Sequence, residues 1–178
     1  MTIRQSLPFS VTENCAALAD EIAAVTRAAF EAEYGSGEGE ARLIAQLRAD
    51  GDVAVELAAL EAGAVIGHVL FSRLIVDPPN RKIAALAPVC ARIDRQRGGV
   101  GSALIRQGLA RCGAQGYDAV AVLGEPDYYR RFGFMRETAA SLRSDYSGEH
   151  YQALELRPGA LTGGPWRVTY PRAFTGID

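Results

Sequence analysis

The chain has 178 residues, of which 48% are hydrophobic and 22% charged, and its formal net charge is −2. This length suits a single domain over residues 1–178 with a sizeable core, and the small charge gives no general attraction to nucleic acid or anionic membranes. Three cysteines (Cys15, Cys90 and Cys112) are too few and too dispersed for a disulfide framework or a metal site. No apolar run has the length of a membrane span and no signal peptide opens the chain, so we expect a cytoplasmic protein.

The first part of the chain predicts one short strand and two helices. The strand is expected at residues 3–7, and Thr12 or Asn14 could cap the helix that follows. The apolar face of that helix comprises Leu18, Ile22, Val25 and Ala29. Residues 34–39 are rich in glycine and predict a loop. The second helix ends near Gly51 and places Leu43, Ile44 and Leu47 inward.

The middle and end of the chain predict strands around two further helices. Apolar runs at residues 53–60 and 64–76 flank Glu61-Ala62-Gly63, which indicates a hairpin. A turn at residues 77–80 leads to an apolar strand at residues 83–91. The later elements are a helix at 102–112, a strand at 119–123, a short helix at 127–131, and strands at 151–156 and 166–170. Periodicity alone favours an α/β or α+β fold without choosing between them.

A glycine-rich run, Gln96-Arg97-Gly98-Gly99-Val100-Gly101, lies between the strand at 83–91 and the helix at 102–112. Glycines there leave backbone N–H groups uncovered at the positive end of a helix, which favours an anion such as a pyrophosphate. No Lys followed by Ser or Thr comes after Gly99, so the phosphate loop of nucleoside triphosphatases is excluded. The glycine spacing also fits the dinucleotide fingerprint poorly.

These residues resemble the GNAT acyltransferase superfamily, whose hallmark is Gln/Arg-x-x-Gly-x-Gly/Ala. Gln96, Gly99 and Gly101 match it, and a Tyr four residues before Gly133-Phe134 resembles the closing motif of that family. Within the family the chain is most similar to the YhbS-type N-acetyltransferases, through Leu86-Ala87-Pro88-Val89, Gly116-Tyr117-Asp118-Ala119-Val120, Leu123-Gly124-Glu125-Pro126 and Tyr170-Pro171-Arg172-Ala173-Phe174. The resemblance implies a mixed-sheet fold of order β-α-α-β-β-β-α-β-α-β-β, with strands four and five splayed apart.

The resemblance also implies acetyl-CoA as co-substrate and assigns candidate residues for binding it. The glycine run would bind the pyrophosphate through the main chain, and the edge of strand four would pair with the pantetheine amides. These candidates are Val89, Cys90, Ala91, Gln96, Arg97, Gly98, Gly99, Val100, Gly101 and Ser102. Gly98 stands where relatives often have Lys or Arg, and Arg131 is a lesser candidate for the ribose phosphate.

Tyr129 is the candidate catalytic residue, because the family assigns the role of general acid to the Tyr at this position. A tyrosine hydroxyl can protonate a thiolate as it leaves a thioester. Tyr128 is adjacent, so this assignment depends on the register counted back from Gly133. The strand at 83–91 has no carboxylate or His to act as a base, which leaves Glu125, water, or an amine already deprotonated. His68 is interpreted as a core or surface residue.

The resulting expectation is an N-acetyltransferase that moves acetyl from acetyl-CoA to a primary amine by direct attack in a ternary complex. The alternative is a module or sensor that binds acyl-CoA with little turnover. The acceptor could be a small molecule or a peptide, a homodimer is left open, and no metal, nucleic acid or membrane partner is indicated.

Overall fold

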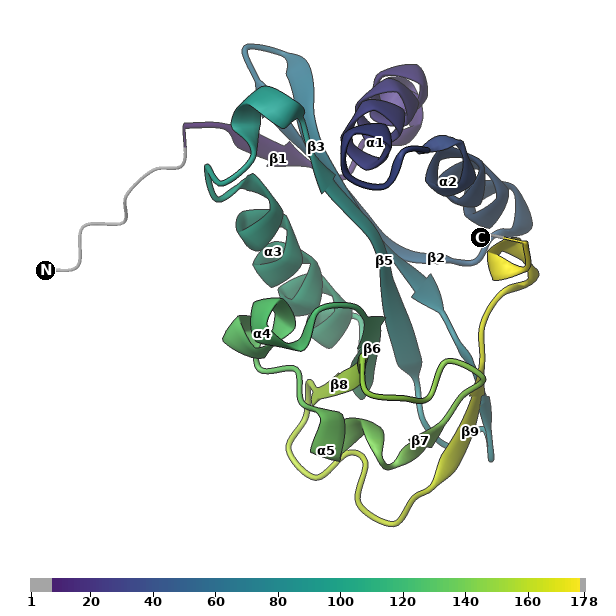
Figure 1. Ribbon diagram of the computed structural model, residues 1–178. Helices are drawn as coiled ribbons and strands as arrows, with labels where there is room; N and C mark the ends of the chain where they lie inside the picture. Colours follow the sequence, from purple (N-terminus) through teal and green to yellow (C-terminus); the bar gives the residue numbers. More distant parts are fainter. Residues whose placement is uncertain (1–7, 177–178) are drawn as a thin grey trace, which may run out of the picture.

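A mixed six-stranded sheet forms the centre of the molecule, with the spatial order β1-β2-β3-β5-β6-β8 (Figure 1). The structure is a computed structural model that describes residues 8–176. The strands of this sheet are β1 (Ser10–Thr12), β2 (Val53–Glu61), β3 (Ala64–Arg73), β5 (Ile83–Ala91), β6 (Ala119–Leu123) and β8 (Tyr151–Glu155). The strand expected at residues 3–7 lies outside the described residues.

Helices cover both faces of this sheet. α1 (Ala19–Tyr34) and α2 (Glu38–Asp50) lie on one face, and α3 (Val100–Ala114) lies on the other (Figure 1). The shorter helices are α4 (Pro126–Tyr129), α5 (Arg136–Ala139) and the 3-10 turns η1 (Ala16–Leu18), η2 (Ile93–Arg95), η3 (Arg130–Phe132) and η4 (Arg172–Phe174). No helix within residues 8–176 is both long and apolar enough to cross a membrane.

The two early helices differ from the sequence prediction at their ends. The expected cap at Thr12 or Asn14 was wrong, since neither side chain caps a helix. The Thr12 hydroxyl instead accepts a hydrogen bond from the Asn14 backbone N–H at 3.1 Å, and η1 precedes α1. α2 begins inside the expected loop and ends at Gly51, whose φ of 74° terminates the helix as predicted.

A second, three-stranded sheet was not expected. It has the order β4-β9-β7 and consists of β4 (Ile75–Asp77), β9 (Trp166–Thr169) and β7 (Leu142–Arg143). The run at 64–76, expected as one strand, therefore divides between β3 and β4. The apolar residues Leu74 and Val76 are buried in a separate core that includes Trp166. They are therefore apolar because they pack against the second sheet, not because they continue β3.

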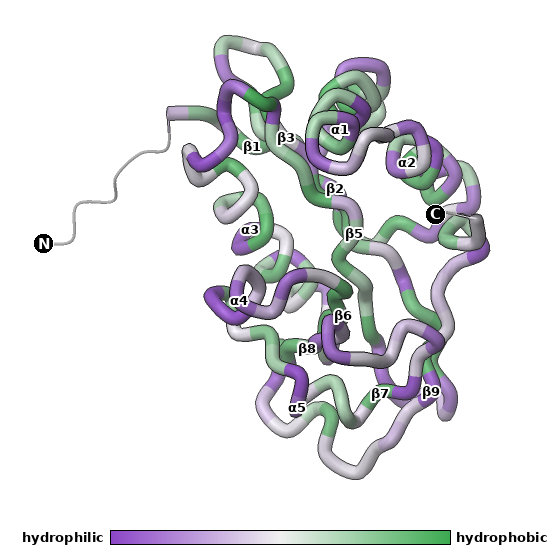
Figure 2. The backbone as a smooth tube through the Cα atoms, in the orientation of Figure 1, coloured by the Kyte–Doolittle hydropathy of each residue, from purple (hydrophilic) through white to green (hydrophobic). Residues whose placement is uncertain are grey.

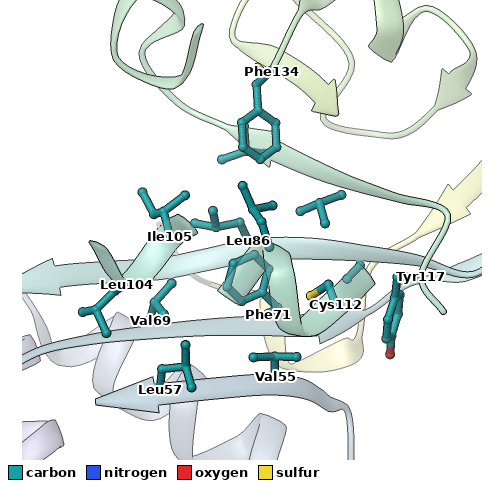
Figure 3. Packing of buried hydrophobic residues seen from close by; sticks show 14 of the residues in the cluster. Val55, Leu57, Val69, Phe71, Leu86, Leu104, Ile105, Cys112, Tyr117 and Phe134 are labelled. Carbon is teal, nitrogen blue, oxygen red and sulfur yellow. The ribbon is translucent and has the colours of Figure 1, made fainter. Parts of the chain in front are cut away.

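The main core lies between the sheet and α3. Figure 3 shows Leu57, Phe71 and Leu86 of the sheet gathered against Leu104 and Ile105 of α3. Hydrophobic residues follow these central strands along the chain trace (Figure 2). This packing fixes α3, and with it the glycine run, at one end of β5.

Strands β5 and β6 are parallel neighbours that separate partway along, as expected from the family fold. Their pairing runs from Ile83 opposite Ala119 to Leu86 opposite Val122. Beyond this point β5 continues to Ala91, still paired with β3 on its other side. The edge of β5 that faces away from β3 is therefore open over its last residues.

Candidate active site

A cleft of about 1230 Å³ lies where β5 and β6 separate. Its walls come from the end of β5, the glycine run, α4, α1 and α2, and the C-terminal turn η4. Every predicted cofactor residue except Gly98 lines it, and so does Tyr129. The candidate residues come from segments far apart in the sequence, and the fold brings them together around one cleft.

The N-terminus of α3 presents backbone donors to this cleft. Gly99 precedes the helix with φ 82°, a left-handed conformation that glycine adopts without a Cβ penalty. The first helical hydrogen bond runs from Ala103 N–H to the Gly99 carbonyl at 2.9 Å, and no side chain caps the helix. The N–H groups of Val100, Gly101 and Ser102 therefore precede the ladder and remain available for an anion.

Gly98 is the one predicted cofactor residue that does not line the cleft. Its N–H donates to the Arg95 carbonyl at 3.3 Å, and a Cβ there would lie 3.1 Å from that oxygen. Its lack of a side chain thus serves the turn. Arg95 pairs with Glu61 and Asp94, whereas Arg97 forms no ion pair with any residue in the described range 8–176.

Cys90 lies on the open part of β5 and lines the cleft, but it is only 7% exposed. Its Sγ lies 3.6 Å from the Oγ1 of Thr26, a buried residue of α1. Burial raises the pKa of the Cys90 thiol to about 11, so it is protonated at neutral pH. Cys15 and Cys112 are also buried free thiols, and neither lines the cleft.

Tyr128 and Tyr129 both line the cleft, with different surroundings. The Tyr129 ring packs edge-on against Phe134 at 5.8 Å between centroids and against Tyr128 at 5.0 Å. It also occupies space left by Gly124, where a Cβ would lie 2.5 Å from Cε2 of Tyr129. Burial raises the pKa of Tyr129 well above its ordinary value, which keeps the hydroxyl protonated.

The Tyr128 hydroxyl points toward the glycine run. A Cβ built on Gly101 would lie 3.5 Å from this oxygen. Arg131, which also lines the cleft, donates from Nε to the Tyr128 carbonyl at 2.9 Å, and its guanidinium stacks on the ring at 4.5 Å. Tyr128 is therefore associated with the anion-binding end of the cleft, and its neighbour Tyr129 is packed deeper.

The sequence did not point to the residues that α1 and α2 contribute. Phe30, Glu33, Tyr34 and Glu40 line the same cleft, opposite the wall made by α4 and the glycine run. They match no motif, and only the packing of the two helices on the sheet brings them there. Gly124, whose missing side chain makes room for Tyr129, belongs to the Leu123-Gly124-Glu125-Pro126 motif, which by itself predicts no role for it.

His68 lies outside the cleft, as predicted, in a buried polar cluster on the α1–α2 face. Its Nε2 lies 2.7 Å from Oε1 of Glu56, and Arg48 makes a two-pronged contact with the same carboxylate. Burial lowers the pKa of His68, so the ring is neutral near pH 7. The pKa of Glu56 is lowered because hydrogen bonds from His68 and Arg48 outweigh the opposing effect of burial.

Comparisons with known proteins agree with these observations. The model of the acetyltransferase (GNAT) family matches residues 19–134. The uncharacterized N-acetyltransferase YhbS of Escherichia coli K12 is 32% identical over 177 residues, covering 98% of both chains. A crystal structure of Escherichia coli YhbS in complex with CoA has a TM-score of 0.86 at 30% identity, covering 98% of this chain and 96% of that one. A GNAT family acetyltransferase from Brucella melitensis, in complex with acetyl-CoA, has a TM-score of 0.77 at 32% identity, with 93% and 97% covered.

Proposed function

The chain belongs to the acetyltransferase (GNAT) family, and we propose that it transfers acetyl from acetyl-CoA to a primary amine in one ternary complex. The observation that carries this proposal is the meeting of three features around one cleft. These are the uncapped N–H groups at the start of α3, the open edge of β5 and the side chain of Tyr129. Binding of CoA or acetyl-CoA by two relatives of 30% identity or more supports the choice of co-substrate.

Each feature would act on a different part of acetyl-CoA. The pyrophosphate would accept hydrogen bonds from Val100, Gly101 and Ser102, with charge supplied by Arg97. The pantetheine amides would pair with β5 at Val89–Ala91, in the manner of an added strand. This binding would direct the thioester toward Tyr129.

The chemical step follows from that placement. The neutral amine nitrogen attacks the thioester carbonyl carbon, the C–S bond breaks, and the electron pair leaves on sulfur. Tyr129 donates its proton to the thiolate as it departs, and the amide nitrogen loses its extra proton to water. No carboxylate or His lies on β5, so rate would come mainly from proximity and orientation in the ternary complex.

A screen of thiol release tests this function. Purified protein is mixed with acetyl-CoA and a broad library of primary amines, and free thiol is followed with time. The proposal expects release that depends on both protein and amine, and calorimetric binding of acetyl-CoA without amine. Binding without turnover on any amine would instead support an acyl-CoA sensor, and absence of binding would exclude both functions.

A further inference from the structure

Arginines and carboxylates line different parts of the cleft. Arg95, Arg97 and Arg131 line the part formed by the glycine run and α4, here called the basic end, where Glu125 also lies. Glu33 and Glu40 line the part formed by α1 and α2, here called the acidic wall. If the basic end binds the phosphates of acetyl-CoA, as proposed above, the acidic wall is left for the acceptor. The inference below rests on that proposed function and concerns its substrate class.

Glu33 and Glu40 line the cleft and have no cationic partner among residues 8–176. Partial burial raises the pKa of the Tyr34 hydroxyl, and a hydrogen bond to Glu33 and the charges of Glu33 and Glu40 raise it further, so both carboxylates act on one side chain. Glu33 and Tyr34 also contribute to the raised pKa of Tyr129, after burial and Tyr128. The acidic wall is therefore within electrostatic range of the catalytic candidate.

Aromatic side chains line the same cleft. Phe30 and Tyr34 of α1 lie 5.8 Å apart between ring centroids, and Tyr34 is 69% exposed. Tyr146 and Phe174 also line the cleft, and their ring centroids lie 4.6 and 5.1 Å from that of Tyr170. An exposed aromatic ring inside a concave site favours a ligand with apolar surface, and ring faces next to carboxylates favour an ammonium group.

We propose that the acceptor is a linear diamine. One nitrogen, in its neutral form, reaches the thioester beside Tyr129, and the second, as an ammonium, binds Glu33 and Glu40. The methylene chain between them lies against Phe30 and Tyr34. A single amine cannot both remain neutral for attack and satisfy these carboxylates, whereas a diamine divides the two tasks between its ends.

Linear amines of similar length, ending in an ammonium, a methyl or a carboxylate, test this assignment. Putrescine, butylamine and γ-aminobutyrate form one such set. Putrescine should have a kcat/KM at least about fivefold higher than that of butylamine. The expected factor is no larger because each charge pair on a solvent-accessible wall contributes only a modest free energy. γ-Aminobutyrate should have the lowest kcat/KM of the three. The advantage of putrescine should shrink as salt is raised from low to physiological concentration. Equal kcat/KM for putrescine and butylamine would overturn the proposal.

Charge-neutral variants locate the second ammonium. Glu33→Gln and Glu40→Gln should each lower the ratio of putrescine to butylamine kcat/KM by about twofold to fivefold. Glu31→Gln is the matched control for Glu33→Gln. Both residues lie on α1 and both substitutions remove one negative charge, but Glu31 does not line the cleft. An unchanged ratio in both cleft variants, or an equal fall in Glu31→Gln, would contradict the assignment.

Failure of the diamine assignment and failure of the proposed function give different results. Turnover of butylamine that equals or exceeds that of putrescine would retain the acetyltransferase and reject the diamine. If acetyl-CoA binds and no amine turns over, calorimetry with the protein–CoA complex still decides, since putrescine should bind more tightly than butylamine. Equal or absent binding of both amines there would reject the diamine as well.

Discussion

Replacing Gly124 with alanine is expected to move the Tyr129 ring without altering Tyr129 itself. The added Cβ would lie 2.5 Å from Cε2 and 3.2 Å from Cδ2 of that ring. Non-bonded carbon atoms prefer a separation of about 3.5–4.0 Å, so the ring must move by roughly 1 Å. Phe134 and Tyr128 pack on other parts of the ring and restrict where it can go.

This displacement predicts a larger effect on catalysis than on folding. Overpacking of this kind costs about 1–3 kcal/mol of stability, whereas a misplacement of about 1 Å at a reacting group can cost roughly a hundredfold in rate. In the thiol-release assay, kcat for Gly124→Ala should therefore fall by about a hundredfold. The KM for acetyl-CoA should change little, because the glycine run and β5 are untouched.

A matched substitution and a double variant separate positioning from general damage. Gly113→Ala is the control, since a Cβ at this site in α3 meets nothing within 4 Å. In a Tyr129→Phe background, Gly124→Ala should add little further loss of kcat, because the hydroxyl it displaces is already absent. Full kcat in a folded Gly124→Ala protein, or losses that simply add in the double variant, would refute this reasoning.

Three further outcomes follow from the same structure. Gly101→Val should weaken acetyl-CoA binding at least about tenfold by calorimetry, because its side chain covers backbone donors, while Gly113→Val should not; equal affinity in both would reject the anion site. Cys90, 7% exposed and with its pKa raised by burial to about 11, should be alkylated slowly and more slowly still with acetyl-CoA bound; equal labelling rates by mass spectrometry would count against its proximity to the thioester. Burial lowers the pKa of His68 in the folded protein, so the unfolded chain binds a proton at this residue at a higher pH than the folded protein does. The free energy of unfolding should therefore decrease as the pH falls below about 6.5. His68→Gln should flatten that decrease in urea titrations, and an unaltered slope would show that Glu56 or other groups cause it.

Motifs and periodicity located the parts of this fold that are encoded locally. The glycine run, the helix after it and the strand at 83–91 lie where expected, because backbone geometry and burial in those segments restrict the residue types. The second sheet escaped prediction because β4 and β7 are two or three residues long, too short to show a period. Residues 64–76 were apolar throughout, and nothing local indicates that the chain changes sheets at Leu74.

Some residues of the candidate site could be predicted from the sequence, and others could not. Gly99 and Gly101 could be found from the sequence, since a helix start that exposes N–H groups needs residues without side chains. Glu33 and Glu40 could not, because exposed glutamates are common on helices and only tertiary packing turns these two toward the cleft. Gly98 belongs to the same motif, and its close approach to the Arg95 carbonyl gives the turn itself a need for glycine there.

The kcat of Tyr129→Phe for thiol release tests the central claim most directly, because this change removes one hydroxyl and keeps the packed ring. On an amine that the wild-type protein acetylates, kcat should fall by about a hundredfold or more, with acetyl-CoA binding nearly unchanged. Tyr128→Phe, measured alongside, should lose far less kcat and affect mainly the KM for acetyl-CoA, since its hydroxyl lies beside Gly101. A Tyr129→Phe protein that retains wild-type kcat, or a Tyr128→Phe protein that is the more impaired in kcat, would contradict the assignment of Tyr129 as general acid.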